Sequence, residues 1–306
     1  MILLTGMTGK SGRWFLQNLI NSNENIRSTR FRVVVRNSSN TDLINKSGLS
    51  IEKANGDLND SIFLDEVMKD IDTIFHIAGI HTSLKVVKAA IKNNVKWIVL
   101  VHTTGIYSKY KSAGEEYRQT EKLIEELISG SNITLTILRP TMIYGSLNDN
   151  NVAIFIKMVD KLHFFPVVNH ASYPLQPVHE KDLGDAYYRV LINERITKGR
   201  NYILSGKSPI LLIDIFKTIG RLLGKKNKFI SVPYRIAYFG AVIVYFTSLG
   251  KIDYREKVQT LVEPRIFSYE DAKKDFGYSP MSFEEGIINE IDEYKNAAFV
   301  KNSFDA

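Results

Sequence analysis

The chain has 306 residues, 44% hydrophobic and 24% charged, which allows about two globular domains and excludes the disordered, collagenous and coiled-coil classes. It has no cysteine, which excludes disulfides, thiolate metal sites and a cysteine nucleophile and favours a reducing, cytoplasmic location. The formal net charge of +7 favours anionic partners. The Lys and Arg residues are dispersed and form no stripe with aromatic residues, so nucleic-acid binding is not expected.

The sequence predicts neither a signal peptide nor a transmembrane helix. The opening MILLTGMTGK does not resemble a signal peptide, because its apolar part is short and no basic region precedes it. The longest apolar run, residues 236–246, is too short to cross a bilayer. Three roles stay open for this run: the core of a second lobe, a subunit or substrate contact, and attachment to a membrane surface.

Short apolar runs alternate with amphipathic segments through the first 140 residues. The pattern predicts strands over 2–5, 31–35, 50–53, 73–77, 97–101 and 133–138, and helices over 11–20, 64–68, 84–91 and 115–128. Strands that are apolar throughout and are each followed by a helix are typical of a parallel sheet buried on both faces. Right-handed crossovers between them predict an α/β, doubly wound Rossmann sheet.

The alternation ends after Tyr144 and Gly145, at the polar run over 148–151. A strand over 173–178 and a helix over 182–192 indicate a return to the sheet, and the chain from Pro209 onward is predicted to be mostly helical. We therefore expect a Rossmann domain formed by 1–145 and about 178–204. A smaller, mostly helical C-terminal lobe would be formed by about 146–177 and 205–306.

The first strand runs directly into a glycine-rich loop with the spacing G-x-x-G-x-x-G. Glycines permit a tight turn and let a pyrophosphate approach the backbone, and the N-terminus of the next helix offers free N–H groups and a positive dipole end. Placed between the first strand and the first helix, the motif predicts a dinucleotide site. The residues expected to bind the cofactor here are Gly6, Thr8, Gly9, Lys10, Ser11 and Gly12.

The end of the second predicted strand bears on the choice of cofactor. Enzymes that use NAD place Asp or Glu there, to hold the ribose hydroxyls. This chain instead continues with Arg36, whose guanidinium could meet a 2′-phosphate. We therefore expect NADP to be preferred over NAD, with a solvated Arg36 as the alternative.

Several stretches together resemble the extended or atypical short-chain dehydrogenase/reductases, the superfamily of nucleotide-sugar epimerases and dehydratases. They are LLTGMTGKSG, NGDLND, TIFHIAG, WIVLVHTTGIY, LTILRPTMIYG, PVHEKDLGDA and GYSPMSFEEGI, and they occur in the family's order. The resemblance implies further cofactor contacts after the third and fourth strands and near the nicotinamide, namely Asp57, Leu58, Ile77, Ala78, Gly79, Pro140 and Ile143. It also implies that Thr103 takes the place of the family's catalytic Ser or Thr.

The family's catalytic Tyr-x-x-x-Lys pair is altered in this chain. The matching residues are Tyr117 and Glu121, one helical turn apart, so the spacing is kept but the charge is reversed. A carboxylate beside the tyrosine would raise its pKa, and Glu121 could still accept bonds from ribose hydroxyls. Thr103, Tyr117 and Glu121 are the candidate catalytic residues, although the spacing between Thr103 and Tyr117 is shorter than in the epimerases.

Two further residues are candidate substrate contacts. His81 follows Gly79 so closely that the chain resembles the branch of the family related to nitrogen-metabolite regulators, some of which bind NADP and catalyse nothing. Tyr144 is expected at the junction of the lobes. The remaining histidines lack the spacing of metal ligands, so no metal site is expected.

These features predict an NAD(P)-dependent oxidoreductase or epimerase acting on a small molecule, and the family resemblance implies a nucleotide sugar or a similar substrate. The alternative is a catalytically silent NADP-binding protein that senses redox state or scaffolds a partner. A homodimer is possible in either case, since the family often dimerises.

Overall fold

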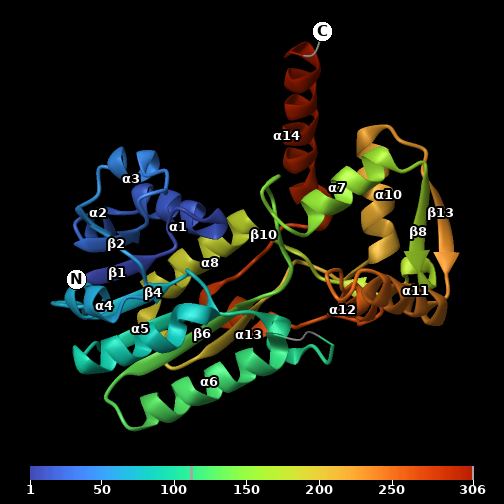
Figure 1. Cartoon of the computed structure of the whole chain (residues 1–306). Helices are drawn as coiled ribbons and strands as arrows, with labels where there is room; N and C mark the ends of the chain where they lie inside the picture. Colours follow the sequence, from blue (N-terminus) through green and yellow to red (C-terminus); the bar gives the residue numbers. More distant parts are fainter. Residues whose placement is uncertain (111–112, 305–306) are drawn as a thin grey trace.

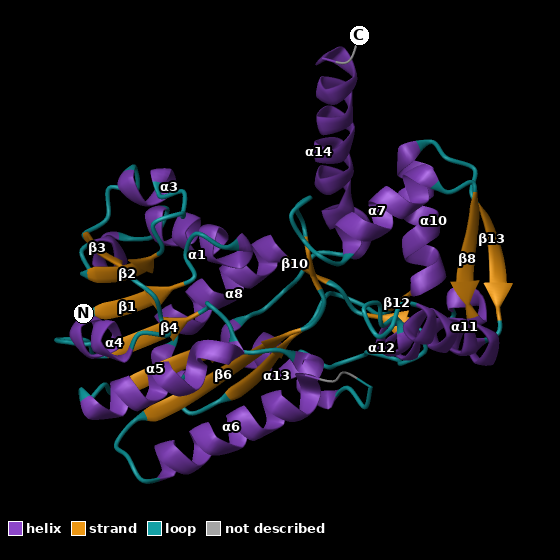
Figure 2. Ribbon diagram, in the orientation of Figure 1, coloured by secondary structure: helices purple, strands orange, loops and turns teal. Residues whose placement is uncertain are grey.

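A parallel sheet forms the centre of the molecule (Figures 1 and 2). The computed structural model describes residues 1–110 and 113–304, and within them the central sheet has seven strands in the order β11-β6-β5-β4-β1-β2-β3. In chain order they are β1 (Ile2–Thr5), β2 (Phe31–Val35), β3 (Ile51–Asn55), β4 (Thr73–His76), β5 (Trp97–Val101), β6 (Thr134–Pro140) and β11 (Asn201–Leu204). The predicted doubly wound α/β fold is confirmed. Its strand order reverses between β1 and β4, where such sheets bind ligands.

Helices cover both faces of this sheet (Figure 1). One face packs against α1 (Lys10–Ile20), α8 (Glu180–Ile192) and α13 (Glu270–Phe276). The other face packs against α4 (Ser61–Val67), α5 (Ile80–Lys92) and α6 (Ala113–Ser129). Shorter helical segments connect these layers: α2 (Glu24–Arg27), α3 (Asp42–Asn45), η1 (Thr104–Tyr107) and α9 (Glu194–Thr197).

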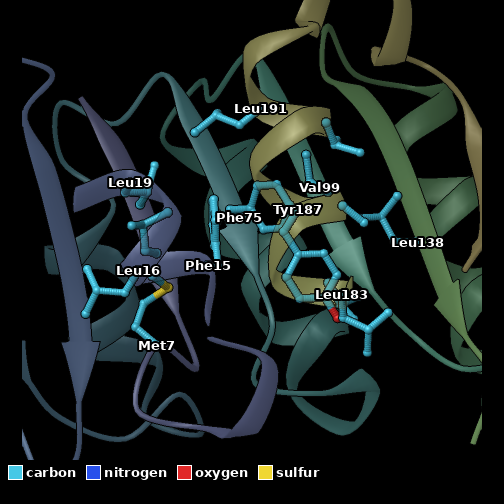
Figure 3. Packing of buried hydrophobic residues seen from close by; sticks show 14 of the residues in the cluster. Met7, Phe15, Leu16, Leu19, Phe75, Val99, Leu138, Leu183, Tyr187 and Leu191 are labelled. Carbon is cyan, nitrogen blue, oxygen red and sulfur yellow. The ribbon is translucent and has the colours of Figure 1, made fainter. Parts of the chain in front are cut away.

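Alternation along the strands divides the core of the sheet into two halves. Leu4, Val33 and Phe75 point to the side of α1 and α8, whereas Leu3 and Ile74 point to the other side. Figure 3 shows the first half, where aromatic rings from α1, β4 and α8 meet. The ring of Phe75 lies 4.8 Å from that of Phe15 and 5.7 Å from that of Tyr187, measured between centroids. Helices therefore cover most of both faces of the sheet, and the open approach to its centre is at the strand ends.

A second group of elements lies beside the carboxyl ends of the strands (Figure 2). Its core gathers apolar residues from 142–175, 210–229 and 261–294. The helical elements are α7 (Val152–Lys161), η2 (Asn169–Ala171), α10 (Leu212–Leu223), α11 (Tyr234–Thr247), α12 (Arg255–Thr260) and α14 (Phe283–Phe304). The strands pair as β7 (Ile143–Tyr144) with β10 (Val178–His179), β9 (Pro174–Leu175) with β12 (Ile210–Leu211), and β8 (Phe164–Val168) with β13 (Lys228–Val232).

One sequence-based expectation about this region is wrong. The segment 173–178 does not join the central sheet but forms parts of two short strand pairs, and β11 takes the edge position beside β6 instead. The chain from Pro209 onward is mostly helical, as predicted, and it also contributes two short strands, β12 and β13, which pair with β9 and β8. These pairings join residues far apart in sequence, which a local pattern does not record.

Candidate functional site

A cavity of about 520 Å³ lies at the carboxyl ends of β1, β2 and β4. Twelve of the expected cofactor residues line it: Gly6, Thr8, Gly9, Lys10, Ser11, Gly12, Arg36, Asp57, Leu58, Ile77, Ala78 and Ile143. Gly79 and Pro140, which were also expected at the cofactor, are not among the residues that line this cavity. The cavity thus collects most of the predicted contacts from five separate stretches of chain.

The glycine loop is packed too tightly for side chains at two of its three glycines. Gly6 has a φ of +76°, and a Cβ on Gly12 would lie 2.1 Å from the carbonyl oxygen of Gly6. Gly9 has an ordinary φ of −81° and caps α1 without a side-chain hydrogen bond. The first N–H groups of α1, at Lys10 and Ser11, have no intrahelical acceptor and border the cavity. This cradle fits a phosphate group.

Polar residues after β2 and β3 form the far side of the cavity. Arg36 is exposed at the tip of β2, and its backbone N–H donates to Ser39 Oγ at 3.3 Å. Asp57 Oδ1 accepts hydrogen bonds from the backbone and side-chain nitrogens of Asn59, at 2.9 and 3.1 Å. The Arg36 guanidinium makes no ion pair with any residue in the described part of the chain, so it is available to an anionic ligand.

Buried hydrogen bonds hold the turn after β4. His76 Nδ1 bonds to Thr5 Oγ1 at 2.8 Å, and its Nε2 lies 3.1 Å from both Gly79 O and Thr82 Oγ1. Burial lowers the pKa of His76 to about 4, so the ring is neutral at physiological pH. Gly79 has a φ of +109°, which favours glycine, and it precedes the first residue of α5. Gly79 therefore shapes the cavity wall without lining it.

A second, larger cavity of about 660 Å³ adjoins the first. Lys10 and Ile143 line both cavities. The second is bounded by the loop after β5, by the turn between β9 and β10, and by the chain after α12. Its lining includes Thr103, Thr104, Tyr107, Lys109, Tyr110, Gln176, Glu263, Arg265 and Phe267. Thr103 Oγ1 accepts a hydrogen bond from the Gly105 N–H, so this hydroxyl caps η1. The two cavities provide adjacent space for a cofactor and a second molecule.

Two cations border this second cavity without a partner among the described residues. Lys10 makes no ion pair or side-chain hydrogen bond in that part of the chain. Arg265 is half-buried, its Nε is inaccessible to solvent, and no described residue accepts a bond from its guanidinium. Burial lowers the pKa of Arg265, and the carboxylate of Glu263 opposes that shift. Glu263 itself is held by Ser108 Oγ at 2.7 Å and the Lys109 N–H at 2.8 Å.

Tyr117 lies outside both sets of cavity-lining residues. Its ring centroid is 5.4 Å from that of His81, which is exposed and 3.5 Å from Glu116. The pKa of Tyr117 is raised, mainly by burial and then by Glu116 and Glu256, not by Glu121 as the helical spacing suggests. His81 does not line either cavity.

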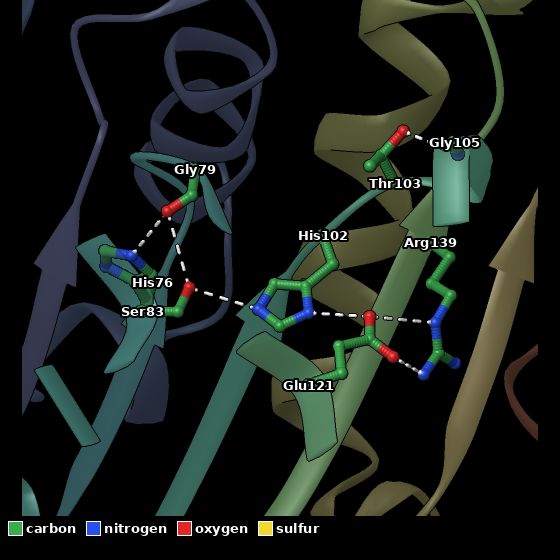
Figure 4. Close-up of polar contacts among 8 residues, drawn as sticks. All are labelled: His76, Gly79, Ser83, His102, Thr103, Gly105, Glu121 and Arg139. Carbon is green, nitrogen blue, oxygen red and sulfur yellow. Dashed lines mark hydrogen bonds and ion pairs between the residues drawn. The ribbon is translucent and has the colours of Figure 1, made fainter. Parts of the chain in front are cut away.

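Glu121 is buried in a polar cluster between α6 and the sheet (Figure 4). Its carboxylate accepts bonds from Arg139 of β6, at 2.5 and 3.2 Å, and lies 2.8 Å from His102 Nδ1. His102 Nε2 in turn bonds to Ser83 Oγ at 3.1 Å, which connects the cluster to the turn at Gly79. Burial would raise the pKa of Glu121, but bonds from His102 and Arg139 outweigh it and lower that pKa.

Tyr144 and Pro140 lie behind the cavity walls. The Tyr144 ring is buried against Phe283 of α14 and His179, with centroid distances of 5.2 Å to each. Pro140 ends β6, and its carbonyl accepts a bond from Thr104 Oγ1 at 3.2 Å. Neither residue lines a cavity, so neither the expected cofactor contact of Pro140 nor the expected substrate contact of Tyr144 is seen.

Sequence reasoning missed much of the second cavity. Arg265 and Gln176 come from segments far from the glycine loop, and Tyr107 belongs to a turn that follows β5. The only sequence signal for these residues was the closeness of Tyr107 to Thr103 in the chain. That signal indicated the loop after β5 but not the C-terminal residues. On the cofactor side, Ser39 and Thr82 were also missed.

Comparisons with known proteins agree with this geometry. A protein-family model described as NAD(P)H-binding matches residues 6–160, just over half of the chain. The NADPH-dependent quinone oxidoreductase of Escherichia coli is 17% identical with a TM-score of 0.70, over 97% of this chain and 100% of that one. UDP-glucose 4-epimerase of Thermotoga maritima is 18% identical with a TM-score of 0.70, over 97% and 99%. No curated protein sequence matches the chain.

The triphenylmethane reductase of Citrobacter sp., in its complex with NADP(H), is 20% identical with a TM-score of 0.69, over 94% of this chain and 98% of that one. At such identities the likeness shows a shared fold over nearly the whole length. The resemblance inferred from the sequence motifs is confirmed in that sense.

Proposed function

Because the chain belongs to the NAD(P)H-binding family, we propose that it is an NADP(H)-dependent oxidoreductase whose substrate occupies the larger cavity. The observation that carries the proposal is the sharing of Lys10 and Ile143 by the two cavities. A molecule in the larger cavity would thus lie next to the cofactor. When bound, the nicotinamide would supply a hydride to a carbonyl or quinone acceptor.

Residues of the first cavity would hold the cofactor as follows. The backbone of the Gly6–Gly12 loop would hold the pyrophosphate, Asp57 and Leu58 would border the adenine, and Arg36 would pair with a 2′-phosphate. A guanidinium–phosphate contact is worth about 1.5–3 kcal/mol, or roughly tenfold to a hundredfold in affinity. NADPH should therefore bind more tightly than NADH.

Lys10 is the residue that we propose to assist the reaction. Its ammonium borders both cavities and has no partner in the described part of the chain, so it can donate a hydrogen bond to an oxygen on which negative charge develops. Thr103 would help to orient the same oxygen. This assignment differs from the family's Tyr-Lys pair, since Tyr117 and Glu121 do not line the cavity.

Arg265 suggests which substrates to test. A guanidinium without an acceptor is costly to bury, and an anionic group on the substrate would remove that cost. Nucleotide sugars, which the family resemblance implies, carry such a group, as do small keto acids. Quinones are included because the Escherichia coli neighbour is a quinone oxidoreductase.

The placement of Tyr117 and Glu121 favours a second candidate, a catalytically silent NADP-binding sensor or scaffold. In that case the cavities would bind the cofactor and an effector without turnover.

Calorimetry with NADPH and NADH, followed by NADPH oxidation assays on nucleotide sugars, keto acids and quinones, separates these possibilities. We expect tighter NADPH binding that Arg36→Ala abolishes, together with turnover of at least one acceptor class. Equal affinities for both nucleotides in the parent protein would contradict the role of Arg36. Binding without turnover of any acceptor would support the silent alternative.

A further inference from the structure

Helix α11 exposes its apolar face. Ile236, Phe239, Ile243 and Phe246 are 62, 65, 48 and 68% exposed, whereas Ala241, on the opposite side, is buried. At 100° per residue the four large side chains fall within an arc of about 80°. A surface helix of a soluble domain normally turns such a stripe toward the core. We call these four residues the α11 stripe.

The segment that carries the stripe also contains the net charge of the protein. Residues 215–252 include seven Lys or Arg and no Asp or Glu. The whole chain has 40 basic and 33 acidic residues, so the remainder, with 33 of each, is neutral. All seven basic side chains are exposed: Lys217, Arg221, Lys225, Lys226, Lys228, Arg235 and Lys251. Lys217 and Lys225 pair with Asp214 and Asp160.

Apolar side chains are also exposed on the neighbouring strand pair. Phe164 of β8 and Ile230 of β13 are 57 and 50% exposed, and the Lys228 ammonium lies 5.6 Å from the centre of the Phe164 ring. Leu249, just after α11, is 87% exposed. Figures 1 and 2 place α11, β8 and β13 together at the end of the molecule away from the central sheet.

We propose that this end of the protein docks on a membrane surface that contains anionic lipids, with the α11 stripe in the interface. Exposed Phe and Ile on a helix flanked by basic residues are typical of helices that lie in the plane of a bilayer, and Arg235 and Lys251 flank the α11 stripe. Arg235 and Lys251 would meet the lipid phosphates, and each would contribute most at low ionic strength.

The geometry excludes insertion across the bilayer and disfavours a second copy of the chain. Helix α11 has 14 residues and is about 21 Å long, shorter than the bilayer core of about 30 Å. Within residues 1–110 and 113–304, no helix is long and apolar enough to cross a membrane. Two copies that met through the stripe would bring their +7 segments together, and like charges would oppose that contact.

Vesicle flotation tests the proposal with the full chain. Vesicles of phosphatidylcholine alone are compared with vesicles that contain about 30% phosphatidylserine, at low and high salt. We expect binding to the anionic vesicles that falls at least tenfold in Phe239→Ser/Phe246→Ser and in Arg235→Glu/Lys251→Glu. Ile62→Ser and Lys69→Glu/Lys88→Glu, which change exposed residues elsewhere by the same chemistry, should bind as the parent does.

Circular dichroism and NADPH affinity show whether each variant is folded. Failure of the folded parent to bind anionic vesicles would overturn the proposal, and so would equal binding to neutral vesicles. A dimer in solution that Phe239→Ser/Phe246→Ser dissociates would also overturn it, because the stripe would then be a subunit contact. None of these readouts depends on turnover, so they are independent of the proposed reaction.

Discussion

The buried cluster around Glu121 leads to a prediction about stability: replacing Glu121 with the family's lysine should lower Tm. Glu121→Ala would leave the Arg139 guanidinium and the His102 imidazole without their shared acceptor, at positions that are 7 and 6% exposed. Removing one partner of a buried ion pair typically costs about 3–5 kcal/mol. An unfolding entropy of about 2.1 cal/mol/K per residue then predicts a fall in Tm of about 5–8 °C.

Glu121→Lys should be the more harmful variant. It recreates the Tyr-x-x-x-Lys spacing but places an ammonium against a buried guanidinium and the imidazole. We expect a larger loss of Tm than in Glu121→Ala, or no folded protein. Glu125→Lys is the matched control, since it makes the same change at an exposed position of α6 and should shift stability by less than about 0.5 kcal/mol.

The assay is thermal unfolding followed by circular dichroism, repeated as a function of pH. Because the pKa of Glu121 is lowered in the folded protein, its stabilising effect is present above the unfolded value of about 4.5 and is lost as pH falls through the folded value. The difference between the parent and Glu121→Gln should therefore shrink in acid. A Glu121→Lys variant as stable as the parent, and more active, would refute this reasoning.

Three further predictions concern the cavities and the packing behind them. Gly9→Val should lower NADPH affinity at least tenfold, because Gly9 borders the cavity and a Cβ there would lie 3.1 Å from the Gly6 carbonyl oxygen. Unchanged affinity by calorimetry would exclude the phosphate site. Lys10→Met should reduce turnover by roughly 10²–10³, whereas Tyr117→Phe should change it by less than about threefold. The reverse order in steady-state assays would indicate that Tyr117, and not Lys10, assists the reaction. Burial and the nearby Asp149 raise the pKa of Glu290 to about 9, so the free energy of unfolding should decline as pH rises from about 5 to 9. Glu290→Gln should flatten that pH profile and raise Tm at pH 9 by roughly 3 °C or more. Identical pH profiles of Tm in the parent and the variant would contradict a buried, protonated Glu290.

The local features of the first cavity could be predicted from the sequence. The glycine loop, Arg36 and Asp57 each follow a strand, and parallel strands bring their carboxyl ends to one edge. All six predicted strands in the first 140 residues begin within one residue of the observed position, and the strand predicted over 73–77 ends one residue earlier, at His76. Apolar runs and turn residues specify such elements over short distances, without knowledge of the rest of the chain.

The partners of charged side chains were decided by the tertiary structure. Helical spacing placed Glu121 on the face of Tyr117, but only the packing of α6 on the sheet brought it to Arg139 and His102. An ion pair of this kind depends on which side chains of β5 and β6 point toward α6, and a one-residue shift in register would reverse that choice.

The second cavity depended on the tertiary structure for the same reason. Arg265 reaches it from a segment that follows the glycine loop by more than 250 residues. The edge strand β11 is a second example of a long-range contact, since it completes the central sheet with only four residues, one of them an exposed Asn. Neither contact has a local periodicity. The sequence alone located the cavity that we propose for the dinucleotide, because that cavity is built from short strand-to-helix turns. The chemistry beside it was decided by long-range packing, because its charged groups come from elements that meet only when the chain folds.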